Sequence, residues 1–258
     1  MQLTSCLSEI ADPMLLQLAR YLAEKLSQPV HFLLDTTWAD REAVLDTHDA
    51  QLGWICGLLH VWKERLVDWE YVPIAAPVMT AVRYQQQPVY FGDVVVHEDN
   101  PCSSLDELAG SRWAYNEATS FSGYHMMLHW LATEQMPDDF FSERICSGAH
   151  SHSLQLVADG VADCALIDST VLDMLSARNP TWQMPLRVVG SLGPYPMPPL
   201  VVSTRLEQSQ RQAIQEAVCE AHEDPSMAHL FAAWGVSHWT AVQNDTYEPI
   251  RQLPLIIW

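Results

Sequence analysis

The chain has 258 residues, of which 48% are hydrophobic and 17% charged, a composition typical of a globular protein with a sizeable core and room for one large or two small domains. Its formal net charge of -19, with thirteen basic residues, excludes nucleic acids and anionic membrane surfaces as partners, because both require clustered Lys and Arg. No apolar run reaches the roughly 18 residues of a membrane helix, so we expect no membrane insertion.

Apolar runs and helical periodicity alternate along the chain. After Asp12 and Pro13, which are typical of a helix start, leucines recur at helical spacing and predict a helix that ends at Leu26. The further predicted elements, in chain order, are the strand Val30–Leu34, the helix Asp40–Asp46, the strands Ala50–Ile55, Tyr71–Met79 and Val89–Val96, the helix Ser104–Ala109, the strand Arg112–Tyr115, the helices Ser122–Glu134 and Ser153–Asp159, the strands Ala162–Ile167, Arg187–Gly190 and Leu200–Ser203, and the helices Glu207–His222, Ser226–Trp234 and Tyr247–Leu253. Strands that alternate with helices over this length predict an α/β fold.

The segment after the predicted strand that ends at Tyr115 has the features of an anion site. Ser120, Ser122 and Gly123 open a predicted helix, where unpaired backbone N–H groups carry partial positive charge and hydroxyl groups can add donors to one small oxyanion. From the spacing alone, a plain helix N-cap with a loop glycine is the competing interpretation.

An ordered series of motifs, of which this segment is one, resembles a known family. The series comprises Asp49–Trp54, Pro88–Pro101, Leu105–Gly110, Ser120–Gly123, Gly148–Leu154, Gly160–Asp163 and Asp245–Arg251. In this order and at these separations, the motifs resemble the periplasmic substrate-binding proteins of phosphate, phosphite and phosphonate ABC importers. The resemblance implies an α/β fold of the two-lobe, type 2 periplasmic-binding-protein kind with a ligand cleft between the lobes. Lobe one would comprise residues 1–96 and 187–258, and lobe two residues 97–186.

The resemblance also implies which residues of the turn bind the ligand. Ser120, Ser122 and Gly123 would contact the oxyanion. Phe121 stands where the family usually has a hydroxyl residue, which removes one donor and adds apolar bulk. A ligand with an apolar substituent is therefore favoured over inorganic phosphate.

Two polar residues further along the chain would complete the site according to the same resemblance. His150 would donate from Nε2 and would bind more strongly when protonated, which a nearby anion promotes. Asp168 would face the ligand and would require a protonated oxygen or an ammonium group opposite it. A lone histidine is usually structural and a strand-end aspartate is usually a turn residue, so both roles depend on the family pattern.

Three aromatic residues are weaker candidates for ligand contact. Tyr90 would cover the ligand with its ring and donate from its hydroxyl group. Trp54 matches a cleft position of the family but is equally well explained as a core residue. Tyr195 lies on the return crossover to lobe one.

No residue pattern predicts a metal or a cofactor. The pairs His125/His129 and His150/His152 lack further ligands and are better explained as surface or capping residues. Six cysteines are scattered without a Cys-x-x-Cys motif, so we expect most of them to be small buried hydrophobes. One disulfide is an alternative in an oxidising compartment. Gly-x-Ser-x-Gly, Walker-type and Gly-x-Gly-x-x-Gly motifs are missing.

We therefore expect a monomeric, non-catalytic solute-binding protein that captures a small oxyanion, foremost a phosphonate or related phosphorus oxyanion, for an ABC permease. Two alternatives remain open: a cytosolic enzyme on the same fold that acts on a small acidic metabolite, and a ligand-sensing module for a kinase or chemoreceptor. Met1–Asp12 has neither a basic start nor an apolar core typical of an export signal. The resemblance implies a periplasmic protein whose leader was removed, and a cytoplasmic relative is the alternative.

Overall fold

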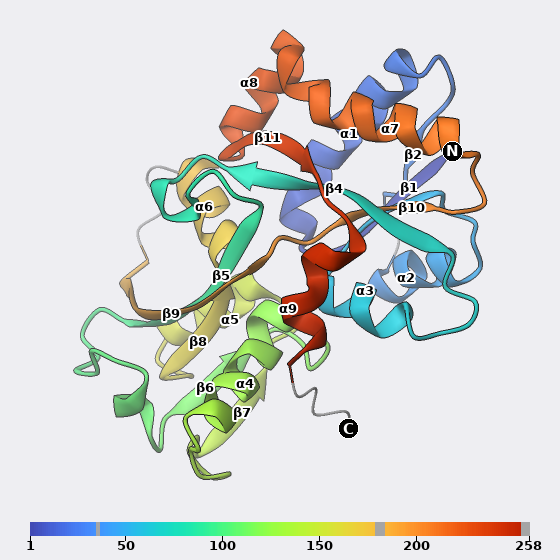
Figure 1. Cartoon of the computed structure of the whole chain (residues 1–258). Helices are drawn as coiled ribbons and strands as arrows, with labels where there is room; N and C mark the ends of the chain where they lie inside the picture. Colours follow the sequence, from blue (N-terminus) through green and yellow to red (C-terminus); the bar gives the residue numbers. More distant parts are fainter. Residues whose placement is uncertain (35–36, 179–183, 254–258) are drawn as a thin grey trace. The chain divides into compact units, whose positions relative to one another are not determined.

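The computed structural model describes residues 1–34, 37–178 and 184–253, which fold into two compact α/β units (Figure 1). Unit 1 combines Met1–Val89 with Pro196–Arg251, and unit 2 is built on Tyr90–Tyr195. The predicted lobe boundaries, after residue 96 and before residue 187, lie within unit 2. The reason is that β5 (Val89–His97) and β9 (Leu186–Pro196) are neighbouring strands of the unit 2 sheet, so the chain crosses between units at the ends of these strands.

Unit 1 is built on a mixed six-stranded sheet. In spatial order its strands are β11 (Val236–Ala241), β4 (Tyr71–Met79), β10 (Leu200–Ser203), β3 (Leu52–Ile55), β1 (Gln2–Cys6) and β2 (His31–Phe32). β1 pairs in parallel with β2 and β3, whereas β10 is antiparallel to β3 and β4, and β11 is antiparallel to β4. The sheet is therefore parallel at one edge and antiparallel at the other.

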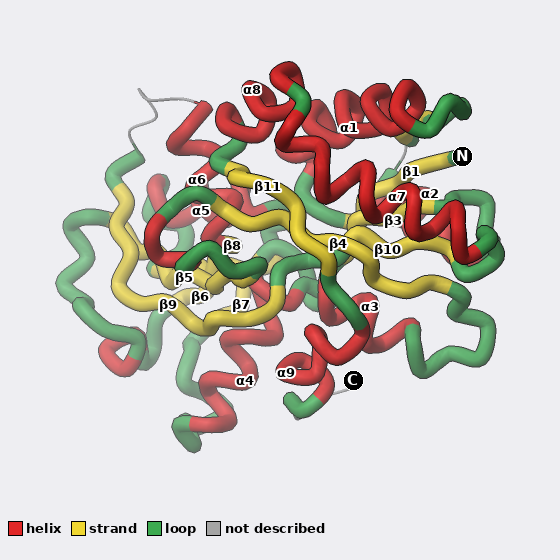
Figure 2. The backbone as a smooth tube through the Cα atoms, turned by 45° about the horizontal axis from the view of Figure 1, so that its top comes forward, coloured by secondary structure: helices red, strands yellow, loops and turns green. Residues whose placement is uncertain are grey.

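Helices cover both faces of this sheet: α1 (Asp12–Lys25), α2 (Trp38–Asp46), α3 (Gly57–Lys63), α7 (Gln208–Glu220), α8 (Pro225–Ala233) and α9 (Glu248–Arg251). α1, α7 and α8 pack together on one side, and α3 packs against α9 on the other (Figures 1 and 2). In α1, Pro13 stands in the first turn, and the side chains of Met14, Leu15, Leu18 and Leu22 are fully buried. Burial of each such side chain contributes roughly 2 kcal/mol, which attaches the helix to the sheet.

Unit 2 is built on a mixed five-stranded sheet. Its strands, in spatial order, are β7 (Glu143–Cys146), β6 (Arg112–Tyr115), β8 (Cys164–Asp168), β5 and β9. β7, β6 and β8 run parallel to one another, and β5 is antiparallel to β8. The carboxyl ends of the three parallel strands therefore meet at one edge of the sheet.

The helices of unit 2 are α4 (Met126–Thr133), α5 (His150–Ala158) and α6 (Ser169–Arg178). A short π-helical turn, Phe121–His125, leads directly into α4 and packs against β8. α5 packs against β6 and β8, and its Leu154 and Val157 join Val95 and Ile167 in a buried core. This packing sets the positions of the π-helical turn and of the start of α5 relative to the strand ends.

Most predicted elements are present, and β4, β6 and β10 have the predicted bounds. The helix predicted at Ser104–Ala109 is reduced to a 3-10 turn, Asp106–Leu108. The sequence pattern does not predict β1, β7, β11, α3 or α6. β1 is missed because its buried residues include Thr4 and Ser5, which interrupt the apolar pattern. β7 is missed because it is an edge strand whose side chains are mostly exposed.

The cysteines differ from expectation. Cys6 and Cys164 are buried, Cys146 is exposed, and the other three are half-buried, so the prediction that most are small core residues is wrong. All six lie within the described residues, and no disulfide joins them. A separate observation concerns the helices: none of those in the described part of the chain has the length and apolar character needed to cross a membrane.

Candidate functional site

The carboxyl edge of the unit 2 sheet gathers the polar residues of the candidate site. Asn116 follows β6, His150 lies beyond β7 at the start of α5, and Asp168 is the last residue of β8. In open α/β sheets, ligands bind outside the carboxyl ends of the parallel strands. The strand order thus brings together residues that are far apart in the sequence.

The π-helical turn places the predicted serines at this edge. Ser120 caps the turn, because its hydroxyl oxygen accepts a hydrogen bond from the Gly123 N–H at 3.1 Å. Short π-helical segments occur often at functional sites. Backbone N–H groups at the start of the turn carry partial positive charge that can stabilise an anion.

Ser122 links His150 and Asp168. Its Oγ lies 3.5 Å from His150 Nε2, and its side chain also hydrogen-bonds the Asp168 carboxyl group. All three residues are buried. Because a carboxylate only accepts hydrogen bonds, we assign the Ser122 hydroxyl as donor to Asp168, which leaves its oxygen to accept from His150 Nε2–H.

The carboxyl group of Asp168 titrates far above the usual range of an aspartate. Its pKa is raised from 3.8 to about 6, chiefly because the group is buried. Hydrogen bonds from Thr170 and Ser122 lower this pKa, and the nearby Asp93 raises it. Thr170 donates to Asp168 Oδ1 from its backbone N–H at 2.8 Å and from its hydroxyl group at 2.7 Å. Close to neutral pH, a fraction of the protein therefore carries a proton on Asp168 that can be donated to a ligand.

His150 is neutral at neutral pH. Burial lowers the pKa of its imidazole from 6.5 to about 4. Without a ligand, the ring therefore donates from Nε2 as a neutral imidazole, and the expected rise of this pKa beside a bound anion stays a prediction. Its Nδ1 is buried and has no hydrogen-bond partner among the described residues.

Gly123 allows two polar side chains to approach the turn closely. A Cβ atom at Gly123 would lie 1.8 Å from Asn116 Oδ1 and 3.0 Å from His150 Cε1, so a larger residue would displace both. Asn116 and Thr170 belong to this group of residues but are not identified by the sequence analysis. Their position in the sequence could have indicated both residues, because each lies within a few residues of the end of a predicted strand.

The aromatic candidates of unit 2 are packed side chains. The rings of Phe121 and Tyr195 meet edge to face with centroids 4.9 Å apart, and Phe121 is fully buried. Tyr90 is also buried, at the start of β5. Phe121 thus attaches the π-helical turn to β9, which carries Tyr195.

Trp54 is a core residue of unit 1. Its indole N–H donates to the Pro198 carbonyl at 2.9 Å, and its ring packs against Trp239 with centroids 5.4 Å apart. The side chain is 4% exposed. Its only hydrogen-bond donor is therefore engaged within unit 1, which favours the core interpretation over ligand contact.

The histidine pairs have different environments. His125 is buried in the π-helical turn and is therefore not a surface residue, but it hydrogen-bonds the backbone of Ala118, and His129 is half-buried. His152 is exposed, with Nδ1 3.2 Å from the Ser147 carbonyl oxygen, as expected of a capping residue. Among the described residues, no group of three or more His, Cys, Asp and Glu side chains could hold a metal ion.

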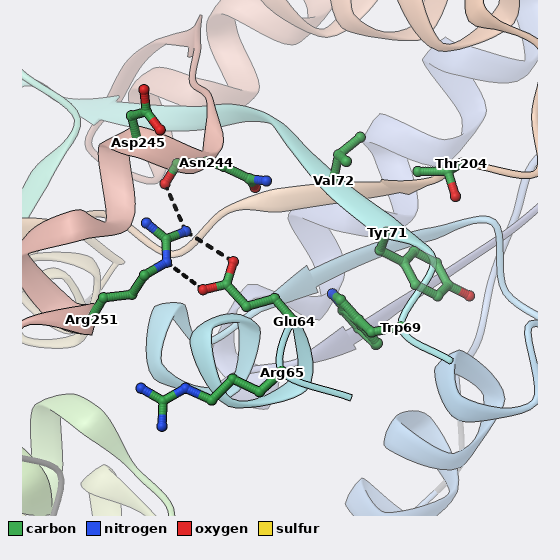
Figure 3. A pocket seen from close by; sticks show the side chains of 9 residues that line it. All are labelled: Glu64, Arg65, Trp69, Tyr71, Val72, Thr204, Asn244, Asp245 and Arg251. Atoms are coloured by element: carbon green, nitrogen blue, oxygen red, sulfur yellow. Dashed lines mark hydrogen bonds and ion pairs between the residues drawn. The ribbon is translucent and has the colours of Figure 1, made fainter. Parts of the chain in front are cut away.

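A polar hollow of about 610 Å³ lies in unit 1 (Figure 3). Arg251 lines it, but its guanidinium group is held by both carboxylate oxygens of Glu64, by Glu248 and by the Asn244 carbonyl. Figure 3 shows the Arg65 side chain pointing away from the other lining residues. The arginine inside the hollow is thus already neutralised, and the hollow lacks the features of an anion site.

Known structures resemble this fold closely. A binding-protein component of an ABC phosphonate transporter from Pseudomonas aeruginosa is 17% identical, with 97% of this chain and 83% of that chain covered and a TM-score of 0.78. PhnD1 from Prochlorococcus marinus in complex with methylphosphonate is 15% identical, with 98% and 96% covered and a TM-score of 0.82. A Xanthomonas citri protein bound to ATP is 15% identical, with 99% of both chains covered and a TM-score of 0.70. These likenesses confirm the predicted two-lobe, type 2 periplasmic-binding-protein fold.

Comparison of the sequence with known proteins identifies the family of the chain. No curated protein matches the chain. A family model, described as the periplasmic substrate-binding protein of phosphonate ABC transporters, matches residues 9–247 and thus nearly the whole chain. The chain therefore belongs to the periplasmic substrate-binding proteins of phosphonate ABC transporters, as its ordered motifs predict.

Proposed function

We propose that this chain binds a small phosphonate with a short organic arm at the carboxyl edge of the unit 2 sheet. The observation that carries the proposal is the convergence of the backbone N–H groups of the π-helical turn and the linked side chains of Ser122 and His150 on the strand ends that also carry the carboxyl group of Asp168. The family supports a solute-binding role, and PhnD1, which has the same fold, is bound to methylphosphonate.

The charges at this edge favour a particular form of the ligand. Asp168 is the acid of the group, and the other side chains assigned to the site are neutral because His150 is not protonated. Two like unit charges 4 Å apart repel by about 4 kcal/mol at an effective dielectric constant of about 20. A monoanion avoids this repulsion when it places a protonated oxygen or an ammonium group opposite Asp168. Fully ionised inorganic phosphate does not.

The composition of the turn favours an organic substituent. Phe121 occupies the position where the family that the motifs resemble usually has a hydroxyl residue, so the turn offers one hydrogen-bond donor fewer. In such a site, one of the four oxygens of inorganic phosphate lacks a hydrogen-bond donor. A phosphonate has only three oxygens that need donors, and its organic arm needs none. Phe121 and Asp168 together therefore select a substituted, protonated oxyanion.

The arrangement of the polar residues supports binding without catalysis. In a Ser-His-Asp triad, the carboxylate orients the histidine through Nδ1. Here Nδ1 of His150 has no partner in the described part of the chain, and Asp168 contacts Ser122 and Thr170 instead. The chain would then act as a monomer in the periplasm and deliver its ligand to an ABC permease. A gene neighbourhood with a permease and an ATPase would support import, and one with a kinase would support sensing.

Native mass spectrometry of the protein purified without added ligand, followed by thermal-shift screening, tests this proposal. The panel contains methylphosphonate, an aminoalkylphosphonate, phosphite, phosphate, sulfonates and small carboxylic acids. We expect the largest stabilisation from a phosphonate. Turnover of any compound, or stabilisation only by compounds without phosphorus, would contradict the proposal.

A further inference from the structure

The side chain of Asn116 has the features of a ligand donor. Its Oδ1 is enclosed and has no hydrogen-bond partner within residues 1–34, 37–178 and 184–253. This oxygen lies against Gly123, since a Cβ atom there would be 1.8 Å from Oδ1 and 2.8 Å from Cγ. Its Nδ2, in contrast, makes no hydrogen bond to the described residues and is not among their enclosed polar atoms without a partner. The amide thus lies with its oxygen inward, and its two N–H donors are left for a ligand.

The position of Asn116 places these donors beside the proposed anion site. It directly follows β6, the middle one of the three parallel strands whose carboxyl ends form the site. Its backbone carbonyl accepts a hydrogen bond from Gly148 N–H at 2.9 Å, which ties it to the loop that leads to His150. The His150 ring lies near the same point, with Cε1 3.0 Å from the position of the added Cβ. Asn116 and His150 therefore both lie close to Gly123.

We propose that the side-chain NH2 group of Asn116 donates a hydrogen bond to the oxyanion and is a specificity-determining residue of this site. The inference rests on the proposed function, because it assigns a further residue to the same site. Such a neutral donor suits a site without Lys or Arg among its assigned residues. With Oδ1 against Gly123, the NH2 group is the end of the amide that is left to face the ligand.

Two substitutions separate this role from a purely structural one. Asn116→Asp keeps the shape and the inner oxygen but replaces the NH2 donor with an acceptor. Asn116→Leu keeps a similar volume and removes both polar atoms. The matched control is Gln155→Glu on the exposed face of α5, which adds the same charge elsewhere in unit 2. Affinity for methylphosphonate is measured by isothermal titration calorimetry near neutral pH, and thermal unfolding without ligand monitors folding.

We expect Asn116→Leu to bind roughly 10- to 100-fold more weakly, the range for a hydrogen bond to a charged group. Asn116→Asp should bind more weakly still, because its carboxylate repels the anion, while Gln155→Glu keeps the wild-type affinity. Both Asn116 variants should keep the wild-type unfolding temperature, whereas Gln155→Glu loses the hydrogen bond of Gln155 to Asp159 and places two carboxylates at i,i+4. Wild-type affinity in Asn116→Asp would overturn the inference, and so would losses of affinity that parallel losses of thermal stability. Ser122→Ala tests the proposed site separately. If it weakens binding while the Asn116 variants do not, only the inference fails, and if wild type binds no phosphonate, both fail.

Discussion

The two buried titratable groups of the unit 2 site should affect stability in opposite directions as the pH changes. The pKa of Asp168 is raised from 3.8 to about 6 by burial, so between these pH values the folded protein holds a proton that the unfolded chain has released. The stability contributed by Asp168 is therefore fully present below pH 3.8 and is lost as the pH rises through about 6.

His150 contributes in the opposite sense. Burial lowers its pKa from 6.5 to about 4, so in this range the unfolded chain holds the extra proton. Its contribution is present above pH 6.5 and is lost as the pH falls through about 4. A pKa difference of one corresponds to about 1.4 kcal/mol, so each group changes the free energy of unfolding by about 3 kcal/mol over its pH range. Because the two changes have opposite signs, they largely cancel in the wild type.

Single substitutions should reveal each contribution. Relative to the wild type, the free energy of unfolding of Asp168→Asn should rise by up to about 3 kcal/mol from pH 4 to pH 7, and that of His150→Gln should fall by a similar amount. The assay is urea unfolding, followed by tryptophan fluorescence, at a series of pH values. Other buried histidines titrate in this range, but they are common to all variants and cancel in the differences. A flat or inverted difference for Asp168→Asn would show that this carboxyl group ionises normally in the folded protein, and the assignment of a proton to Asp168 close to neutral pH would then be wrong.

Three further outcomes are expected from the π-helical turn. Ser122→Ala should weaken methylphosphonate binding in calorimetric titrations by about 1.5–3 kcal/mol. Ser120→Ala should mainly lower the free energy of unfolding, by about 1 kcal/mol, because it removes the N-cap. Unchanged affinity in both variants would place the site elsewhere. Phe121→Thr should lower the free energy of unfolding by about 2–4 kcal/mol, because it leaves a cavity beside Tyr195. The same substitution should shift the ratio of the affinities for an aminoalkylphosphonate and for phosphate toward phosphate. A ratio equal to that of the wild type would show that Phe121 does not select the ligand. Gly123→Ala should abolish binding, since its Cβ would displace Asn116 and His150, and retained affinity would refute the close approach of these side chains.

Local patterns in the sequence were sufficient for the fold class and for many elements. A buried apolar strand such as β4, or an amphipathic helix such as α1, is encoded by residues that are neighbours in the chain, so its bounds can be predicted without knowledge of its partners. The order of the motifs predicted the family, and it also indicated Ser122, His150 and Asp168, because their separations in the chain are themselves part of the pattern. Elements without a local apolar pattern, such as β1 and β7, could not be found in this way.

Tertiary structure decided which residues converge and in which protonation state. The unit boundaries follow from the membership of β5 and β9 in one sheet, a long-range relation that periodicity does not contain. Asn116 joins the site because β6 lies between β7 and β8. The pKa values of His150 and Asp168 depend on burial by residues distant in sequence, since removal of water disfavours the charged form of each group. The sequence by itself therefore determined the types of chemical group available, while the packing of the chain around them determined their charge.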